Sequence, residues 1–425
     1  MILKNATILT VDNQNTILVN SDIKIEDNKI VEIGKDLSGT ETIDCSGKVI
    51  MPGFVNCHAH MPMTIFRSLA EEDNDRLKKY VFPIEGKFIT PENVQIATDF
   101  SLLETIASGQ TTIADMYYYD KEIADCFKAA NVRMVACETI IDEGGETFNT
   151  ELGRLEHFEK LDQEYNGDDL INVCIAPHAP YTNSLEMLKR CKQISDERNI
   201  PLMIHVSEMK FEEGEYKGSP SVIQYLEKHQ LLDSKTILVH TLYLEDEDYA
   251  IIAKHGSKVA HCPVSNAKGG RTTLNLKAMQ ENSITVGFGT DGAMSGNRMD
   301  FHSTLYFASK MHKHTNLDRG FLKNYEVIRM ATIDSAKVLG LDSQIGSIEV
   351  GKQADLIVID TNMPNMMPVY DVESAIVNTL DTTNIKMTIV NGKVIYQDGN
   401  YLTLDKDDVL TKFTNLTKEI VDFIK

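Results

Sequence analysis

The sequence predicts an α/β protein: a (β/α)8 TIM-like barrel joined to a small β-sandwich domain that both chain ends build. Two observations predict it. Between residues 53 and 343, short apolar runs alternate with longer amphipathic segments, the rhythm of parallel strands and helices. Near the two ends the pattern changes to short runs of alternating apolar and polar residues, broken by turn residues, as in antiparallel sheets.

The chain ends are expected to pair with each other. Residues 7–11 and 22–25 alternate in the first 52 residues, and 346–360 and 388–396 do the same near the other end. The sequence therefore predicts a composite β domain from 1–52 and 344–425, and a catalytic barrel from 53–343. The last stretch is expected to form an amphipathic helix packed on the body, from its apolar residues Leu410, Phe413, Leu416, Ile420 and Phe423.

The barrel strands are expected to carry polar side chains where they end. About eight runs are strand candidates, the number in a closed barrel; they are 53–56, 111–114, 132–136, 172–176, 201–204, 236–239, 258–260 and 285–289. In such barrels the carboxyl ends of the strands meet at one mouth, which is the active site. The residues that follow the strands are His58, His60, Asp115, Glu138, His178, His205, His240, His261 and Asp291.

Four of these residues are the predicted metal ligands. His58 and His60 are two positions apart on a strand and point to one face. With His205 and Asp291 they offer three nitrogens and a carboxylate, a donor set that suits catalytic zinc. Each alone could be a hydrogen-bonded core residue; the joint placement at strand ends favours a metal site. Strand four ends at His178 without a lysine that could bridge two ions, so one divalent metal is expected, Zn²⁺ first, although iron or manganese would accept the same ligands.

Three residues are candidates for the chemistry. Glu208 lies three positions beyond His205, close enough to exchange protons with a substrate beside the metal; the alternative is a carboxylate that supports the ligands or a solvated loop charge. His240 could hydrogen-bond the attacking water, or could be a buried strand-end histidine. Asp291 could accept a proton from that water, or could be a turn carboxylate.

Composition narrows the classes of molecule that the chain is expected to bind. A formal net charge of −21 argues against nucleic acid and anionic membranes. The first residues lack the apolar core of a signal peptide, and no apolar run approaches the roughly 20 residues of a membrane span. Seven scattered cysteines without a Cys-x-x-Cys pair suit reduced thiols. The expected location is cytoplasmic and the expected partner is a small molecule.

Six segments together resemble the amidohydrolase superfamily, and within it the 5-methylthioadenosine/S-adenosylhomocysteine deaminases. The resemblance extends over nearly the whole chain and implies a metal-dependent deaminase. Members of this family are often multimeric, so the resemblance also implies that a homo-oligomer is possible. The segments are 52–60 (Pro-Gly-Phe-Val-Asn-Cys-His-Ala-His), 204–208, 239–240, 261–266, 289–292 and 351–356.

The resemblance also implies substrate contacts. Glu85 matches a glutamate that binds ribose hydroxyls, Arg154 an arginine that meets the 5′ substituent, and His178 a histidine that contacts the nucleoside. Without the resemblance, Glu85 and Arg154 would be interpreted as ordinary charged residues of a helix or loop. The sequence departs from the family pattern in two places that bear on which nucleoside is bound. Arg76 stands where the family often has a tryptophan that lines the nucleoside pocket. Residues 267–272 bring two positive charges in place of a Ser-Gly loop.

The predicted function is hydrolytic deamination of an adenosine-type nucleoside, such as 5-methylthioadenosine or S-adenosylhomocysteine, to its inosine analogue and ammonia. Glu208 would donate a proton to N1 of the ring. His240 would stabilise the attacking hydroxide, and Asp291 would take the proton of that hydroxide. Glu208 and Asp291 are therefore also expected to contact the substrate. One alternative is another amidohydrolase, such as a guanine or cytosine deaminase or an aryl-halide hydrolase. The other is a non-catalytic barrel scaffold.

Overall fold

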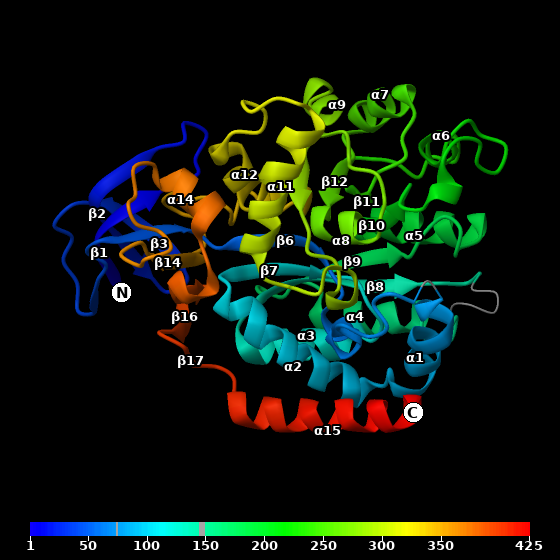
Figure 1. Ribbon diagram of the computed structural model, residues 1–425, viewed down its shortest axis with the longest axis horizontal. Helices are drawn as coiled ribbons and strands as arrows, with labels where there is room; N and C mark the ends of the chain where they lie inside the picture. Colours follow the sequence, from blue (N-terminus) through cyan, green and yellow to red (C-terminus); the bar gives the residue numbers. More distant parts are fainter. Residues whose placement is uncertain (74, 144–148) are drawn as a thin grey trace.

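The computed structural model describes residues 1–73, 75–143 and 149–425, and its centre is an eight-stranded parallel sheet (Figure 1). The strands lie in chain order, each beside the next, as the alternating rhythm predicted. Their bounds are β6 Phe54–Ala59, β7 Gln110–Asp115, β8 Arg133–Ile140, β9 Ile171–Pro177, β10 Leu202–Val206, β11 Thr236–His240, β12 Lys258–His261 and β13 Val286–Phe288.

The eighth strand returns to the first. The backbone N–H of Asp291, just beyond β13, donates to the carbonyl of His58 at 3.0 Å. The Asn56 amide donates to the Thr290 hydroxyl at 2.8 Å, and the Thr290 N–H donates back to Asn56 at 3.1 Å. These bonds bring the carboxyl ends of the first and last strands together, so the barrel prediction is confirmed.

Helices surround the strands, and several begin at side chains that cap them. Thr90 accepts a hydrogen bond from the N–H of Asn93 at the start of α2, and Ser184 does the same for Met187 in α5. The helices between successive strands are α1 Phe82–Phe88, α2 Pro91–Ala107, α3 Asp120–Ala130, α4 Leu155–Tyr165, α5 Leu185–Arg198, α6 Val222–Lys228, α7 Asp246–His255, α8 Pro263–Lys268 and α9 Leu276–Glu281; α10 Ala293–Gly296, α11 Phe301–Thr315, α12 Asn324–Met330 and α13 Ile333–Val338 follow β13.

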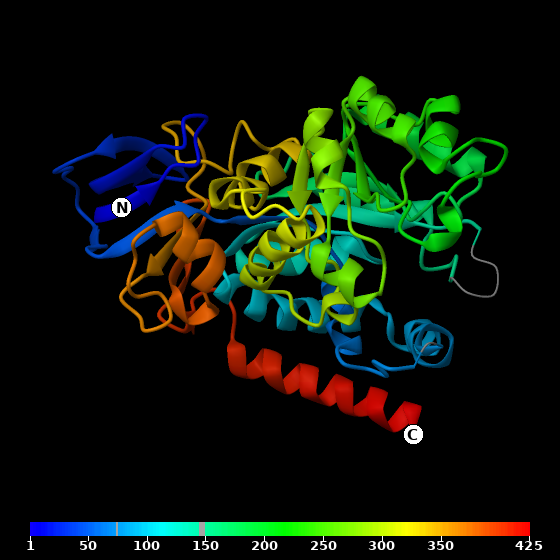
Figure 2. The ribbon, with the colours of Figure 1, turned by 45° about the horizontal axis from the view of Figure 1, so that its top comes forward.

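The two chain ends share a second, nine-stranded sheet, as predicted. β5 pairs antiparallel with β14, with Met51 opposite Ile357, and so joins the first fifty residues to the last seventy (Figure 2). The sheet curls around an apolar core that takes residues from both ends, among them Ile23 and Val358. Its strands are β1 Ile2–Leu9, β2 Ile17–Glu26, β3 Lys29–Gly34, β4 Thr42–Asp44, β5 Lys48–Pro52, β14 Leu356–Asp360, β15 Ile385–Val390, β16 Lys393–Gln397 and β17 Asn400–Tyr401, with α14 Val372–Thr379 between β14 and β15. The domain division at residues 53 and 343 stays a prediction.

A buried ion pair links this sheet to the barrel. Arg133, the first residue of β8, donates from Nε to the Asp355 carboxylate at 2.8 Å, and both side chains are almost fully buried. The same carboxylate accepts the N–H of Asn391 at 2.7 Å. Both charges are therefore compensated by hydrogen bonds, as burial requires.

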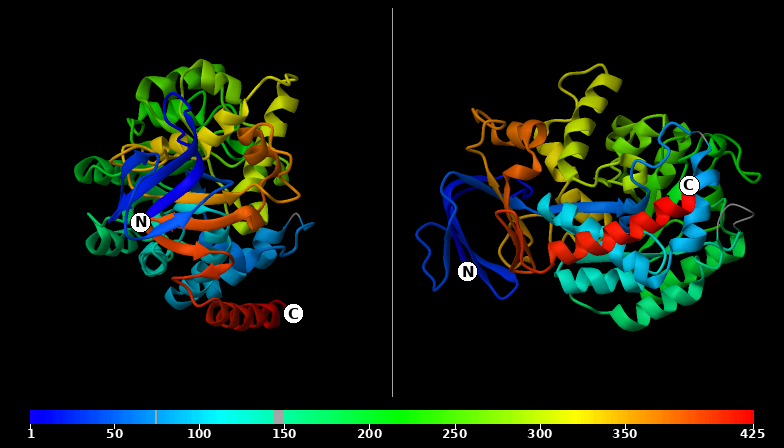
Figure 3. Two further views of the ribbon diagram at one scale, coloured as in Figure 1. Left: turned by 90° about the vertical axis from the view of Figure 1, so that its left-hand side faces the viewer. Right: turned by 60° about the horizontal axis from the view of Figure 1, so that its bottom comes forward.

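The C-terminal segment forms the predicted amphipathic helix, α15 Lys406–Ile424, which crosses the outside of the barrel along α2 (Figure 3, right). Val409, Leu416 and Ile420 are buried beneath it. The Phe413 ring stacks on Phe100 with the centroids 3.7 Å apart. No helix in the described part of the chain, α15 included, is long and apolar enough to cross a membrane.

Candidate active site

The four predicted metal ligands converge at the carboxyl end of the barrel. His58 and His60 lie on and just after β6, His205 on β10, and Asp291 after β13. The Nε2 atoms of His58 and His205 are 3.2 Å apart, and Nε2 of His60 is 3.3 Å from Oδ1 of Asp291. Two ligands of a tetrahedral zinc ion stand about 3.3 Å apart, since each bond is about 2.05 Å long. The spacing thus fits a metal ion.

The other ring nitrogens hold the three imidazoles in place. Nδ1 of His205 donates to the carbonyl of His178 at 2.8 Å, and Nδ1 of His60 donates to the carbonyl of Met116. Nδ1 of His58 lies 3.4 Å from the Met203 sulfur. A backbone acceptor at Nδ1 turns Nε2 of His60 and His205 toward the site, which is how proteins orient histidine ligands. The residues present therefore fit a divalent metal.

Electrostatics keep this cluster in its metal-binding form. Burial lowers the pKa of His205 to about 4, and burial with two neighbouring imidazoles lowers that of His58 well below its usual range, so both rings are neutral. Burial raises the pKa of Asp291, but hydrogen bonding and attraction to His60 outweigh it and hold the carboxyl well below its usual pKa. Burial lowers the pKa of His60, but the hydrogen bond to Asp291 outweighs it and raises that pKa above its usual value. A metal ion bound here would therefore displace a proton from His60, while His58, His205 and Asp291 are already in their coordinating forms.

Glu208 and His240 lie together beside the metal ligands. Oε1 of Glu208 is 3.6 Å from Nε2 of His240, whose Nδ1 donates to the Asn266 side chain at 3.0 Å. Burial raises the pKa of Glu208, but attraction to His240 and Arg271 outweighs burial and lowers the pKa below its usual value, so the carboxyl is ionised. An ionised, partly screened carboxylate next to an oriented imidazole can accept a proton and pass it on.

The backbone is strained at two residues of the site, His240 and Asp291. His240 has φ 74° and Asp291 has φ 60°, the left-handed region that residues other than glycine seldom adopt. Their backbones are held there by the barrel: the Asp291 N–H reaches His58, and the N–H of Thr241 donates to the carbonyl of Val206 at 3.0 Å. Such strain persists only where the surroundings fix it, and it is concentrated at functional sites.

Glu212 supports the loop that carries Glu208, and sequence reasoning did not single it out. Its buried carboxylate accepts the backbone N–H groups of Ser207 at 3.1 Å, Glu208 at 3.0 Å and Met209 at 3.0 Å. Burial raises its pKa to about 7. In the sequence it is one of several charges between 208 and 215, and only the folded loop distinguishes it.

A cavity of about 400 Å³, large enough for a nucleoside-sized molecule, is lined by His60, His205, Glu208, His240 and Asp291. Glu85 lies in its wall, and the hydroxyl of Tyr117 donates to its carboxylate at 2.7 Å. Burial raises the pKa of Glu85 to about 7. Apolar side chains from the segment before Glu85 and from the opposite loops complete the wall; they include Leu77, Val81, Phe82, Met116, Phe211 and Met294.

The remaining predicted substrate residues are placed differently. His178 lines the cavity, with Nδ1 3.0 Å from the Thr182 hydroxyl. Arg154 does not line it: its side chain is half exposed and pairs with Glu151 at 3.2 Å. Arg76 pairs at 3.9 Å with Glu71, outside the cavity lining, while Leu77 beside it supplies apolar wall. Of residues 267–272, Arg271 lines the cavity.

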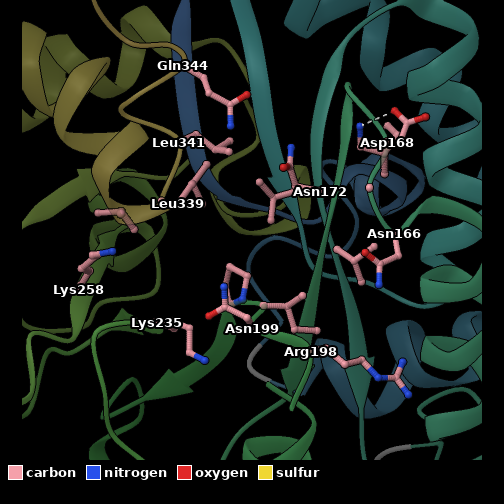
Figure 4. Close-up of a pocket in the computed structure, with 18 of the residues that line it drawn as sticks. Asn166, Asp168, Asn172, Arg198, Asn199, Lys235, Lys258, Leu339, Leu341 and Gln344 are labelled. Atoms are coloured by element: carbon pink, nitrogen blue, oxygen red, sulfur yellow. Dashed lines mark hydrogen bonds between the residues drawn. The ribbon is translucent and has the colours of Figure 1, made fainter. Parts of the chain in front are cut away.

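A second cavity, of about 420 Å³, opens at the opposite end of the barrel, where β9 to β12 begin (Figure 4). Its lining includes Arg198 at the end of α5, Lys235 just before β11 and Lys258 at the start of β12, together with Leu339 and Leu341. Arg198 is bound by Glu159 and Asp162. The predicted ligand and proton-transfer residues are all at the other mouth, which is therefore the candidate active site.

A (β/α)8 barrel with three histidines and an aspartate at its carboxyl mouth defines a metal-binding barrel of the hydrolase type. The chain belongs to the amidohydrolase family, whose profile matches residues 49–395. It is 32% identical over 430 residues to a 5-methylthioadenosine/S-adenosylhomocysteine deaminase of Thermoanaerobacter pseudethanolicus, with 99% of each chain covered.

Two further relatives agree with this assignment. A 5'-deoxyadenosine deaminase of Methanobrevibacter smithii is 34% identical over 421 residues, covering 96% of this chain and 95% of the relative. Among solved structures, an adenosine deaminase from Xanthomonas campestris with bound zinc superposes with a TM-score of 0.94 at 25% identity, covering 99% of this chain and 98% of the other. The family resemblance seen in the sequence is confirmed.

Proposed function

We propose that the chain is a metal-dependent hydrolytic deaminase of adenosine-type nucleosides, which converts a 5′-substituted adenosine to its inosine analogue and ammonia. The observation that carries the proposal is one cavity, which is lined by His60 and His205 of the histidine cluster, by the Glu208–His240 pair and by the partly buried carboxylate of Glu85. The names of the relatives agree, because they are deaminases of 5-methylthioadenosine, S-adenosylhomocysteine or 5'-deoxyadenosine.

The metal site is assigned to His58, His60, His205 and Asp291, with one ion per chain and Zn²⁺ as the first choice. A divalent metal held there supplies a water whose pKa is lowered to near neutrality. The hydrogen bonds at Nδ1 of His60 and His205 turn the Nε2 atom of each ring toward the metal site. Asp291, held ionised by His60, is placed to accept the proton of the attacking water and deliver it to the departing ammonia.

Glu208 is the proposed proton donor to N1 of the purine ring. Because its carboxyl is ionised, it would first take one proton from the attacking water and pass it to N1, while Asp291 would take the second proton of that water for the departing ammonia. Protonation of N1 makes the ring an electron sink and favours attack at C6. His240 is oriented by Asn266, so that Nε2 can stabilise the attacking oxygen. Glu208 and His240 lie 3.6 Å apart, so proton transfer and attack would take place within one site.

Glu85 and His178 are the proposed nucleoside contacts. A carboxylate accepts two hydroxyl hydrogens, which matches the 2′ and 3′ hydroxyls of ribose. Glu85 already accepts one bond from Tyr117, so the carboxylate is held in one orientation. Arg154, exposed in the free chain, stays a prediction for the 5′ substituent, as do a cytoplasmic location and a homo-oligomer.

A substrate panel tests the proposal. The zinc-loaded chain is assayed for ammonia release from S-adenosylhomocysteine, 5-methylthioadenosine, 5'-deoxyadenosine and adenosine, and from the free bases guanine and cytosine. We expect release from the nucleosides and none from the bases. Release from a base alone would favour a guanine or cytosine deaminase, and no release from any of them would favour a non-catalytic barrel.

A further inference from the structure

The guanidinium of Arg271 is bound to the Glu208 carboxylate. Its Nη2 lies 3.0 Å from Oε1 of Glu208, and both side chains are largely shielded from solvent. His240 is the other basic group within 4 Å of this carboxylate among the described residues. Glu208 is thus held at its charged end by one imidazole and one guanidinium.

The loop after α8 delivers Arg271 to this position. The chain leaves the helix at Lys268 and turns at Gly270, whose φ is 64°. The N–H of Arg271 then donates to the carbonyl of Asn266 at 3.0 Å. Lys268 anchors the same loop, because its Nζ donates to the carbonyl of Met294 at 2.9 Å. The path of the loop is therefore fixed at both its start and its turn.

Gly269 gives the guanidinium room. A Cβ at this position would lie 3.1 Å from Nη1 and 3.2 Å from Cζ of Arg271. The arginine side chain folds back over the glycine backbone on its way to Glu208. A methyl group there would push the guanidinium away without removing its charge.

The same segment also orients His240. Asn266 accepts the N–H of Arg271 through its backbone and the Nδ1–H of His240 through its side chain. On the other side, Glu212 fixes the backbone of Glu208. The loop after α8 thus controls both members of the proton-transfer pair, and Arg271 is its contact with the carboxylate.

We propose that Arg271 is a positioning residue, which fixes the Glu208 carboxylate beside His240 for proton transfer to the substrate. The inference rests on the proposed function, and it assigns a role to a loop that departs from the expected Ser-Gly pattern. Because Arg271 acts through Glu208, its removal lowers kcat by the same factor for every substrate. An arginine that anchored the substrate would instead change KM, and only for substrates with an anionic group.

The test compares R271M, R271K and the control K277M, which removes an exposed lysine from α9. Kinetics are measured with 5'-deoxyadenosine, which has no anionic group, and with S-adenosylhomocysteine, which has a carboxylate. We expect R271M to lower kcat about 100-fold on both, the loss that a displacement of about 1 Å can cause. KM should change little, R271K should regain part of kcat, and K277M should match the wild type, all at equal metal content.

Two further observations keep the inference testable. G269A, which keeps the arginine but crowds it, should lower kcat in the same direction. In crystals of R271M, the Glu208 carboxylate should leave its position beside His240. A wild-type kcat in R271M, a rise in KM confined to S-adenosylhomocysteine, or an unmoved carboxylate would each overturn the proposal. A wild-type enzyme that releases no ammonia would instead overturn the proposed function, and the crystal comparison would still test the role of Arg271.

Discussion

The Nε2 atoms of His58 and His205 face each other at 3.2 Å, although 147 residues separate them in the chain. Both rings are neutral, and their Nε2 atoms stand at about the 3.3 Å separation expected of two ligands of one tetrahedral zinc ion. His205 is turned by the carbonyl of His178, while His58 is held within the barrel wall. This relationship is the basis of the metal site and of the predictions below.

Exchange of Glu208 for glutamine should abolish most turnover. The amide keeps the shape of the side chain but cannot accept and return a proton, so kcat should fall about 100- to 10,000-fold. Ammonia release measures the effect, and metal analysis shows that the site is intact. The matched control is E213Q, a neighbouring exposed carboxylate that pairs with Lys210; it should be unaffected. Near-normal turnover of E208Q would contradict the proton-transfer role.

Exchange of Glu85 for glutamine should weaken nucleoside binding. The carboxyl group that accepts the ribose hydroxyls is lost, which is expected to raise KM about 10- to 100-fold. The comparison substrate is a 2′,3′-dideoxy analogue, for which the wild type and E85Q should differ little. E92Q, at the exposed start of α2, is the control. An unchanged KM for the ribonucleoside would remove Glu85 from the binding site.

Acid should destabilise the fold through His312. Burial lowers its pKa to about 4, while the unfolded chain titrates near 6.5, so between these values the unfolded state binds the additional proton. The free energy of unfolding should therefore fall as pH drops from 6.5 to 4, by up to about 1.4 kcal/mol per pH unit from this residue. H312Q should show a shallower slope in urea unfolding, and the exposed H314Q should not. Equal slopes in all three proteins would refute the assignment.

Breaking the Arg133–Asp355 pair should loosen the barrel from the terminal sheet. R133M leaves a buried carboxylate with one backbone partner, and D355N leaves a buried guanidinium, so each should cost about 3 to 5 kcal/mol of unfolding free energy. K412M, which removes an exposed pair on α15, should cost less than about 1 kcal/mol. Denaturant unfolding measures all three, and a small effect of R133M would show that the pair is dispensable.

The metal ligands could be predicted from the sequence because they follow simple periodicities. His58 and His60 share a face by the two-residue repeat of a strand, and His205 and Asp291 end runs that read as parallel strands. The barrel topology then brings those ends to one mouth. For these residues, local pattern and global fold give the same answer.

The supporting residues could not be predicted, because loop conformation decides their place. Glu212 meets three backbone N–H groups only when the 207–212 loop is folded, and Arg271 reaches Glu208 only because Gly269 and Gly270 turn the chain back. Arg154 shows the converse. Its resemblance to a substrate arginine suggests the pocket, whereas its side chain pairs with Glu151 at the surface of the free chain.

The most direct test of the account is a zinc titration of the chelator-treated protein. Ammonia release from 5'-deoxyadenosine is measured as zinc is added, alongside the bound metal per chain. The account predicts almost no activity without metal, and a linear rise that stops at one zinc per chain and is lost when His58 or His205 is replaced by alanine. Full turnover by metal-free protein, or a rise that continues to two ions per chain, would contradict it.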